Sequence, residues 1–185
     1  MDAVSAAFEA VPRAGFLPEG ARGSASYDGP LPIGHGQTSS QPRTVEAMLR
    51  LLDVRRGVRV LDVGSGSGWT TALLAHLTGP TGTVLGVELE PELATWGAAN
   101  LERTGSGWAR IRPARPGELG DPGGAPFDRI LVSADGGEVP ESLVEQLADH
   151  GRMVLPAAGV LLAVVRDGDR IRTSRHGHYR FVPLR

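Results

Sequence analysis

Val-Arg-Val-Leu-Asp-Val-Gly-Ser-Gly-Ser-Gly-Trp, residues 58–69, is the stretch that decides how this chain is expected to fold. Apolar and β-branched residues at alternate positions lead into Asp62 and a run of alternating glycines, which predicts a buried strand that ends in a tight turn. Residues 70–77 then begin a helix. Because glycine has no Cβ, such a turn lets a ligand approach the backbone amides at the start of the helix. The stretch therefore predicts a nucleotide-type binding site.

The spacing of these glycines distinguishes between two classes of nucleotide site. The dinucleotide fingerprint needs glycines at the first, third and sixth positions of the turn. Counting from Gly64, the sixth position is Trp69, so an NAD oxidoreductase is disfavoured. An acid followed by alternating glycines instead resembles the first motif of S-adenosylmethionine-dependent methyltransferases. Here that motif is met by Asp62, Gly64, Gly66 and Gly68.

A second acidic residue is expected to complete the cofactor site. Glu88 follows the next predicted strand, residues 83–87, where a carboxylate can accept hydrogen bonds from both ribose hydroxyls of a nucleoside. The alternative is a solvated carboxylate at a strand end. Asp62 is expected to accept hydrogen bonds from the turn that it precedes and so to hold the glycines in place. It could also reach the methionine amine of the cofactor.

The composition indicates one soluble domain and excludes several kinds of site. A chain of 185 residues is long enough for one substantial core and too short for two. The absence of cysteine excludes disulfides, thiolate metal sites and a cysteine nucleophile. A net charge of -2 creates no field that would attract nucleic acid. With no leader-like start and no run of about 18 apolar residues, we expect a cytoplasmic monomer that contacts neither membrane nor nucleic acid.

Helical and strand patterns alternate after residue 57, which predicts a parallel sheet with helices on both faces. Beyond the strands at 58–63 and 83–87, strands are expected at 108–112, 127–132 and 153–155, and helices at 70–77, 91–101 and 140–148. Asp-Gly at 167–168 predicts a hairpin between 160–165 and 170–173, and a short strand at 179–182 ends the chain. The expected fold class is α/β: a Rossmann-like, doubly wound, mostly parallel seven-stranded sheet with a C-terminal antiparallel hairpin.

The first 56 residues are expected to lie outside this core. A short helix at 4–11 precedes an irregular arm, 12–42, rich in proline and glycine. Segments of this length without secondary structure are uncommon in compact domains unless they bind something. A helix at 42–52 follows, for which Ser40 or Thr44 is a candidate cap. The arm is therefore the expected substrate-binding segment.

Several separated stretches resemble one family, the protein-L-isoaspartate O-methyltransferases. The arm carries the most specific likeness, and the cofactor turn, a later strand and the chain end also match. The matching stretches are Val11-Pro12-Arg13, Phe16-Leu17-Pro18, Tyr27-Asp28, residues 30–38 with Ser40 and Pro42, residues 61–68, Ala125-Pro126-Phe127-Asp128, Val139-Pro140 with the helix that follows, and Phe181-Val182-Pro183-Leu184. The resemblance covers nearly the whole chain. It implies a single methyltransferase domain, 1–185, made of an N-terminal helix, arm and capping helix, 1–56, and a Rossmann-like core, 57–185.

The resemblance implies methyl transfer from S-adenosylmethionine to a peptide carboxylate, the first step in converting isoaspartate to aspartate through a succinimide. A carboxylate is already ionised at neutral pH, so the reaction needs positioning and water exclusion rather than a general base. The family's substrate-contacting serine falls on Ser40, and Thr38 lies beside it as a second catalytic candidate. The other candidates for cofactor binding are Gln37, Ser39, Asp62, Gly64, Ser65, Gly66, Gly68, Trp69, Glu88, Leu89 and Gly117, and for substrate binding Ile33, His35, Ser40 and Asp135.

The sequence also departs from the family pattern. Ser39 stands where the family has an apolar residue, so either serine could face the substrate. Pro116 stands where the family has an aspartate that contacts adenine. These departures favour two alternatives: an enzyme that methylates ordinary aspartate in one ribosomally made peptide and leaves an aspartimide, and a catalytically silent module that binds cofactor or peptide. His176 and His178 share a strand face, but we expect no metal site without a third ligand.

Overall fold

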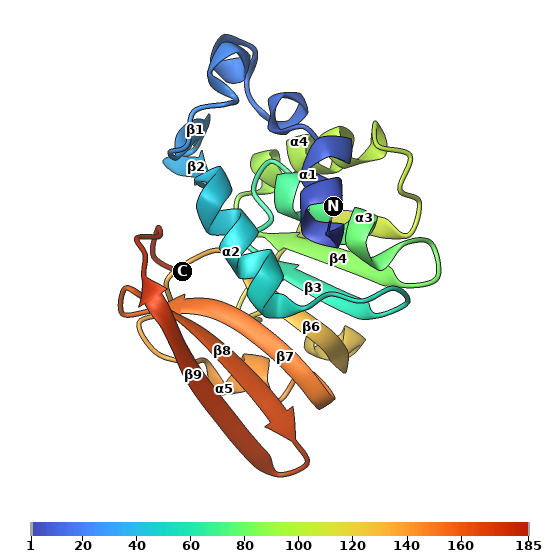
Figure 1. The fold of residues 1–185 in the computed structure, drawn as a ribbon, viewed down its shortest axis with the longest axis vertical. Helices are drawn as coiled ribbons and strands as arrows, with labels where there is room; N and C mark the ends of the chain where they lie inside the picture. Colours follow the sequence, from blue (N-terminus) through green and yellow to red (C-terminus); the bar gives the residue numbers. More distant parts are fainter. Residues whose placement is uncertain (1, 185) are drawn as a thin grey trace.

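A computed structural model describes residues 2–184 of the chain, and its centre is one seven-stranded sheet (Figure 1). The strand order is β5-β4-β3-β6-β7-β8-β9. The pairs from β5 to β7 are parallel, whereas β8 and β9 run antiparallel to their neighbours. The strands are β3 (Arg59–Val63), β4 (Thr83–Glu88), β5 (Ala109–Pro113), β6 (Phe127–Val132), β7 (Leu147–Ala157), β8 (Val160–Asp167) and β9 (Arg170–His178). The expected fold class is confirmed.

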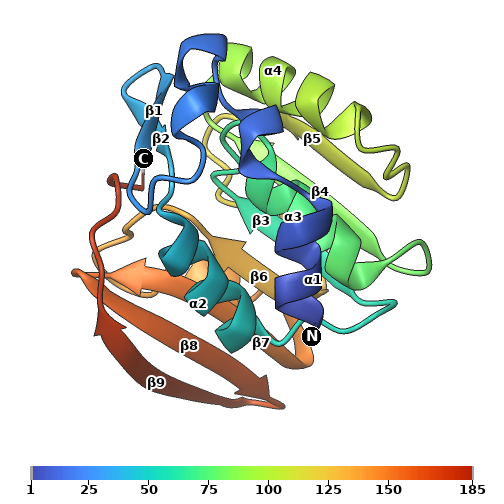
Figure 2. The same ribbon diagram turned by 45° about the horizontal axis from the view of Figure 1, so that its top comes forward.

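The helices cover the two faces of the sheet unequally. Figure 2 shows α1 (Ala3–Ala10), α2 (Pro42–Leu52), α3 (Trp69–Thr78) and α4 (Pro91–Glu102) along one face. On the other face, the apolar cluster is completed by the short α5 (Glu141–Val144) and by loop side chains such as Leu119 and Ala125. Proline and glycine between β5 and β6 prevent a longer helix there, and only the 3-10 turn η3 (Pro122–Gly124) forms. Within residues 2–184, no helix is long and apolar enough to cross a membrane.

The helix expected at 140–148 is wrong beyond its first turns. α5 ends at Val144, and the chain enters β7 at Leu147, which pairs with Phe127 of β6. The Phe127 amide donates to the Gln146 carbonyl (2.8 Å), and the buried Gln146 side chain accepts from the Asp121 amide (2.8 Å). Pairing with a neighbouring strand has overridden the local helical pattern.

The chain end also differs from expectation. The hairpin is confirmed and its strands are longer than predicted, but residues 179–182 do not form a strand in the sheet. They cross back to the tip of β6, where the Asp135 amide donates to the Val182 carbonyl (2.8 Å) and the Leu184 amide donates to the Asp135 carbonyl (2.8 Å). We call residues 179–184 the C-terminal tail.

The arm is more regular than the sequence predicted. It contains the 3-10 helices η1 (Arg13–Phe16) and η2 (Glu19–Ser24) and a small hairpin of β1 (Leu31–Gly34) with β2 (Gln37–Ser39). Helix α2 begins after Gln41 without a side-chain cap, so neither Ser40 nor Thr44 caps it. Proline at its first turn supplies the favourable backbone angle instead.

Candidate functional site

A cavity of about 770 Å³ lies at the carboxyl edge of the sheet. Its volume is that of an ordinary ligand pocket, and its place is the one where ligands bind in open α/β sheets. The wall is built from the arm, the turns that follow β3 to β6, and the C-terminal tail. These contribute, among others, Ile33, Gln37, Thr38, Ser39, Ser40, Gly64, Ser65, Gly66, Ser67, Trp69, Glu88, Leu89, Gly117, Glu118, Ser133, Glu138, Pro183 and Leu184. Segments far apart in sequence therefore form one site.

The glycine turn is held tightly against β4 and α4. The amides of Gly64 and Ser65 donate to the Val87 carbonyl (2.9 and 3.1 Å). Gly68 has φ +92°, and a Cβ there would lie 2.7 Å from the Gly97 carbonyl oxygen of α4. Gly68 is not part of the cavity wall, so it serves helix packing rather than direct ligand contact. The close approach of α4 thus fixes the shape of the turn that faces the cavity.

Glu88 is a buried carboxylate on the wall, 7% exposed. Its Oε2 atom accepts from the Gly66 amide (2.8 Å) and its Oε1 atom accepts from the Glu90 amide (3.1 Å). Each carboxylate oxygen can accept more than one hydrogen bond. The backbone therefore orients Glu88 and leaves it able to accept from a bound ligand.

Asp62 is fully buried behind the turn, and it does not reach the cavity wall. Its Oδ2 atom accepts from the hydroxyls of Thr70 (2.8 Å) and Thr71 (2.7 Å) at the start of α3, not from the turn as the sequence predicted. Burial raises the pKa of Asp62 to about 6, although the two threonine hydroxyls oppose this shift. Asp62 thus ties β3 to the first turn of α3.

Two buried polar atoms in the described residues lack a hydrogen-bond partner, Asp62 Oδ1 and Ser65 Oγ. Buried polar groups in proteins are normally paired, with protein, water or ligand. Ser65 lies on the cavity wall between the glycines. Its hydroxyl is buried against β4, so the fit to a nucleoside-type cofactor rests on the glycine turn and the Glu88 carboxylate, which both line the cavity.

The two serines of the arm differ in what their hydroxyls do. Ser39 is 6% exposed, and its Oγ atom accepts from Arg13 Nε (3.0 Å). Ser40 also lies on the wall, and its hydroxyl has no hydrogen-bond partner among residues 2–184. The free hydroxyl is therefore that of Ser40, and Gln37 and Thr38 flank it on the same wall.

Two residues predicted to bind substrate lie outside the cavity wall. The exposed His35, at the β1–β2 turn, forms an ion pair with Glu92 (3.4 Å). The Asp135 carboxylate accepts from the amides of Gly137 (2.8 Å), Ala158 (2.9 Å) and Gly159 (2.9 Å), and these bonds, that of Gly137 first, lower its pKa. His35 thus contacts helix α4, and Asp135 holds two turns of the protein. The role of each in substrate binding stays a prediction.

Other wall residues were missed from the sequence. Ser133 follows β6 at the carboxyl edge, where ligands are expected in such sheets, but it was not among the candidate site residues. Pro183 and Leu184 carried no such signal, because only the return of the C-terminal tail brings them to the site. Pro116 and Glu118 both line the part of the cavity that follows β5. Glu118 places a carboxylate there, and it pairs with Arg115 (3.5 Å).

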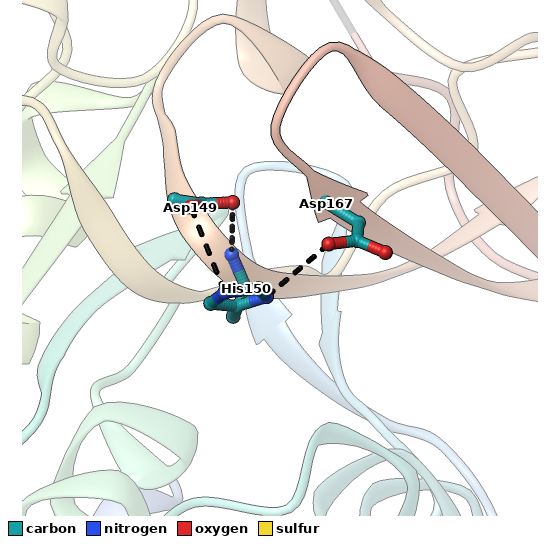
Figure 3. Close-up of side chains that lie close together, drawn as sticks. All are labelled: Asp149, His150 and Asp167. Carbon is teal, nitrogen blue, oxygen red and sulfur yellow. Dashed lines mark hydrogen bonds and ion pairs between the residues drawn. The ribbon is translucent and has the colours of Figure 1, made fainter.

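A separate polar cluster lies at the opposite edge of the sheet, where β7 begins and β8 ends (Figure 3). Asp149, His150 and Asp167 are, in the described part of the chain, the group whose ligand-type atoms lie within 4.8 Å of one another. His150 Nε2 faces Asp149 (3.6 Å), His150 Nδ1 faces Asp167 (3.5 Å), and Asp167 also pairs with Arg172 (3.3 Å). Ion pairing on an exposed surface accounts for this cluster.

Comparison with known proteins places this geometry in a family. The model of the family described as protein-L-isoaspartate(D-aspartate) O-methyltransferase matches residues 1–185. The chain belongs to this family. A protein-L-isoaspartate O-methyltransferase of Methanopyrus kandleri is 46% identical over 98% of this chain and 82% of its own length. One from Methanocella arvoryzae is 44% identical over 94% of each chain.

Solved structures of the same family share the fold. One protein-L-isoaspartate O-methyltransferase superimposes with a TM-score of 0.90 at 26% identity, covering 100% of this chain, which spans 61% of that longer one. A Plasmodium falciparum protein described as a putative member, in complex with S-adenosyl-L-homocysteine, gives a TM-score of 0.85 at 27% identity and covers 100% of this chain and 91% of its own. That relative binds the demethylated form of the predicted cofactor.

Proposed function

We propose that this chain transfers a methyl group from S-adenosylmethionine to the carboxylate of isoaspartate in peptides or proteins. The products are S-adenosylhomocysteine and a methyl ester, which closes to a succinimide when the backbone nitrogen attacks it and methanol leaves. The observation that carries the proposal is that the predicted cofactor residues and the arm line the same cavity. The glycine turn and Glu88 line one part of it, and the arm presents the unpartnered Ser40 hydroxyl in another. Relatives with 44–46% identity are protein-L-isoaspartate O-methyltransferases, which supports this substrate.

The cofactor half of the cavity would be held by groups already in place. The backbone of the glycine turn lines the cavity, and Glu88 would accept from the ribose hydroxyls. Glu118 and the backbone of residues 114–117 would surround the adenine. When bound, S-adenosylmethionine supplies an electrophilic methyl group.

The acceptor half needs no proton transfer. The substrate carboxylate is ionised at neutral pH, so the residues here have to hold it and exclude water. The Ser40 hydroxyl would donate to that carboxylate, with Thr38 beside it. The apolar side chains of Ile33, Pro183 and Leu184 would limit access of water to the reacting atoms.

Methyl transfer to matched peptides tests the proposal. Radiolabelled S-adenosylmethionine is incubated with two peptides that differ only in one residue, isoaspartate or aspartate. We expect label on the isoaspartyl peptide, in several unrelated sequences, and succinimide as the product. Transfer confined to aspartate in one peptide would support the tailoring alternative, and failure of calorimetry to detect S-adenosylmethionine binding would contradict both enzymatic functions.

Substitution of Ser40 tests the acceptor site separately. A hydrogen bond to a charged group contributes about 1.5–3 kcal/mol, so Ser40→Ala is expected to lower kcat/KM for the isoaspartyl peptide about 10- to 100-fold. Binding of S-adenosylhomocysteine, measured by calorimetry, should change little. Unchanged kcat/KM would remove Ser40 from the acceptor site. The monomeric state and the cytoplasmic location stay predictions, of which light scattering tests the first.

A further inference from the structure

A buried arginine holds the arm from inside the protein. Arg13, in η1, is 5% exposed. Its Nη1 atom donates to the Tyr27 carbonyl (3.0 Å), and its Nη2 atom donates to the carbonyls of Gly29 (3.0 Å), Ser39 (2.9 Å) and Ser40 (3.0 Å). The Nε atom donates to the Ser39 hydroxyl (3.0 Å). Every one of these acceptors belongs to the arm, at two places that are ten or more residues apart in sequence.

The same guanidinium contacts the first residue of α3, which follows the glycine turn. Arg13 Cζ lies 5.5 Å from the centroid of the Trp69 ring, a contact that favours a cation. The Trp69 Nε1 atom donates to the Val11 carbonyl (3.0 Å), which fixes the ring beside η1. Arg13 therefore connects the turn proposed to bind cofactor with the arm proposed to bind the methyl acceptor.

A buried cation without a carboxylate partner usually costs free energy. Within residues 2–184, no carboxylate forms an ion pair with Arg13; the nearby Asp28 pairs with Arg43 instead (3.2 Å). Carbonyl and hydroxyl oxygens of the arm take the place of a counter-ion. Because these oxygens satisfy the guanidinium, any loosening of the arm would leave the buried charge poorly solvated. The arm is thus held in one arrangement.

The contacts of Arg13 also distinguish between the two serines. Arg13 binds the hydroxyl of Ser39, but only the carbonyl of Ser40. Ser39 ends β2 with its side chain buried and its hydroxyl bound to Arg13. Of the two serines on the cavity wall, Ser40 is therefore the one whose hydroxyl is left for a ligand.

We propose that Arg13 is the positioning residue of the acceptor site, which fixes the arm and selects Ser40 rather than Ser39 as the hydroxyl that faces the substrate. The inference rests on the proposed function, in which Ser40 binds the substrate carboxylate. Lysine cannot replace Arg13, because an ammonium has its donors at one point, whereas these acceptors surround a planar fork.

The first test compares Arg13→Lys with the wild-type enzyme. We expect KM for the isoaspartyl peptide to rise about 10-fold or more, from the loss of hydrogen bonds to a charged group, while kcat and the affinity for S-adenosylhomocysteine change less than about 3-fold. Hydrogen exchange should accelerate in residues 27–40 and stay unchanged in β3 and β6. Arg22→Lys is the matched control, because Arg22 is exposed and donates one hydrogen bond, to the Leu17 carbonyl (3.3 Å). Neither KM nor hydrogen exchange in the arm should change in this variant.

The second test asks whether Arg13 selects between the serines. Ser40→Ala is made in the wild-type and in the Arg13→Lys background. If Arg13 selects Ser40, the loss of kcat/KM caused by Ser40→Ala, about 10- to 100-fold in the wild type, shrinks to about 3-fold or less in Arg13→Lys, because Ser39 is then free to substitute. If Ser40→Ala lowers kcat/KM by the same factor in both backgrounds, Arg13 does not select between the two serines.

The outcomes separate this inference from the proposed function. A wild-type protein that methylates no isoaspartyl peptide contradicts the function, whereas the exchange data on residues 27–40 still decide whether Arg13 holds the arm. If Arg13→Lys has the wild-type KM and the wild-type rate of hydrogen exchange in the arm, the inference about Arg13 is wrong but the proposed function is unaffected. If Arg13→Lys fails to fold, Ser39→Ala removes only the Nε acceptor, and its arm exchange should then rise by a smaller factor; no rise would contradict the proposal.

Discussion

Asp62 and Glu88 are both buried carboxylates at the ends of neighbouring parallel strands, but their surroundings give them different tasks. Glu88 accepts from two backbone amides and faces the cavity. Asp62 accepts from two threonine hydroxyls with one oxygen, and its other oxygen has no partner in the described chain. Asp62 pairs with Gly86, so Glu88 lies two residues further toward the carboxyl edge. The carboxylate nearer that edge lines the cavity, and the other attaches helix α3.

The raised pKa of Asp62 predicts a pH effect on stability. Between the ordinary value, 3.8, and about 6, the folded chain binds a proton that the unfolded chain does not. This group therefore lowers the free energy of unfolding as pH rises through that window, by about 3 kcal/mol in all. Asp62→Asn keeps an oxygen for the threonine hydroxyls and cannot ionise. It should raise the free energy of unfolding at pH 7.5 by roughly 1–2 kcal/mol.

Urea unfolding at pH 4.5 and 7.5 measures this prediction. The difference in unfolding free energy between the two pH values should be smaller in Asp62→Asn than in the wild type. Asp62→Ala is a useful comparison, because it removes the charge and also the acceptor for Thr70 and Thr71. If Asp62→Asn has the same pH dependence of unfolding free energy as the wild type, then the ionisation of Asp62 does not cause that dependence.

At the scale of elements, the site depends on how closely α4 approaches the glycine turn. A Cβ on Gly97 would lie 2.6 Å from the Gly66 carbonyl oxygen, too close for any real contact. The Gly66 amide is the donor to Glu88. A packing contact between a helix and a turn therefore sets the position of a backbone group that the cofactor is proposed to meet.

Gly97→Ala should consequently disturb both stability and binding. Glycine to alanine in a helix usually stabilises, but here the added methyl group overpacks a rigid backbone and should lower the free energy of unfolding by roughly 1–3 kcal/mol. The affinity of Gly97→Ala for S-adenosylhomocysteine, measured by calorimetry, should also be lower than that of the wild type. Ala99→Gly, on the exposed side of the same helix, is the control: it should cost about 1 kcal/mol and leave the affinity unchanged. Wild-type affinity in Gly97→Ala would contradict the coupling.

At the scale of the whole molecule, Asp135 joins three segments at the edge of the cavity. Its carboxylate binds the turn between β7 and β8, and its backbone binds the C-terminal tail. Pro183 and Leu184 of this tail form part of the wall of the cavity that the arm also lines. The C-terminal tail therefore contributes to the wall of the cavity that is proposed to bind substrate.

Asp135→Asn tests whether Asp135 holds the C-terminal tail on the cavity wall. The amide nitrogen of asparagine would face a backbone amide, so the variant should lose about 1–3 kcal/mol of stability and show a raised KM for peptide as the tail leaves the wall. Asp128→Asn is the matched control, since Asp128 accepts from the Arg59 amide (2.7 Å) at the opposite edge of the sheet. It should lose stability without a change in KM. Because the pKa of Asp135 is lowered, its contribution is present above pH 3.8 and is lost as pH falls below that value.

Local chemistry made much of this protein predictable from its sequence. Strand β6 and helix α2 have the predicted bounds, because apolar periodicity and proline act over neighbouring residues. The α5–β7 boundary was not predictable, because pairing with Phe127 outweighs the helical pattern of residues 145–148. The arm's hairpin was not predictable either, and its end at Ser39 contacts the distant Arg13.

The sequence by itself determined the fold class, the glycine turn with its two acids, and the family, because these depend on residue types at fixed short spacings. Only the tertiary structure decided which of the two serine hydroxyls is free, which acids face the cavity, and that the C-terminal tail lines it. Those properties follow from contacts such as Arg13 with Ser39 and Asp135 with Ala158, whose partners are more than 20 residues apart. The direction of a side chain depends on such distant partners, and no local pattern records it.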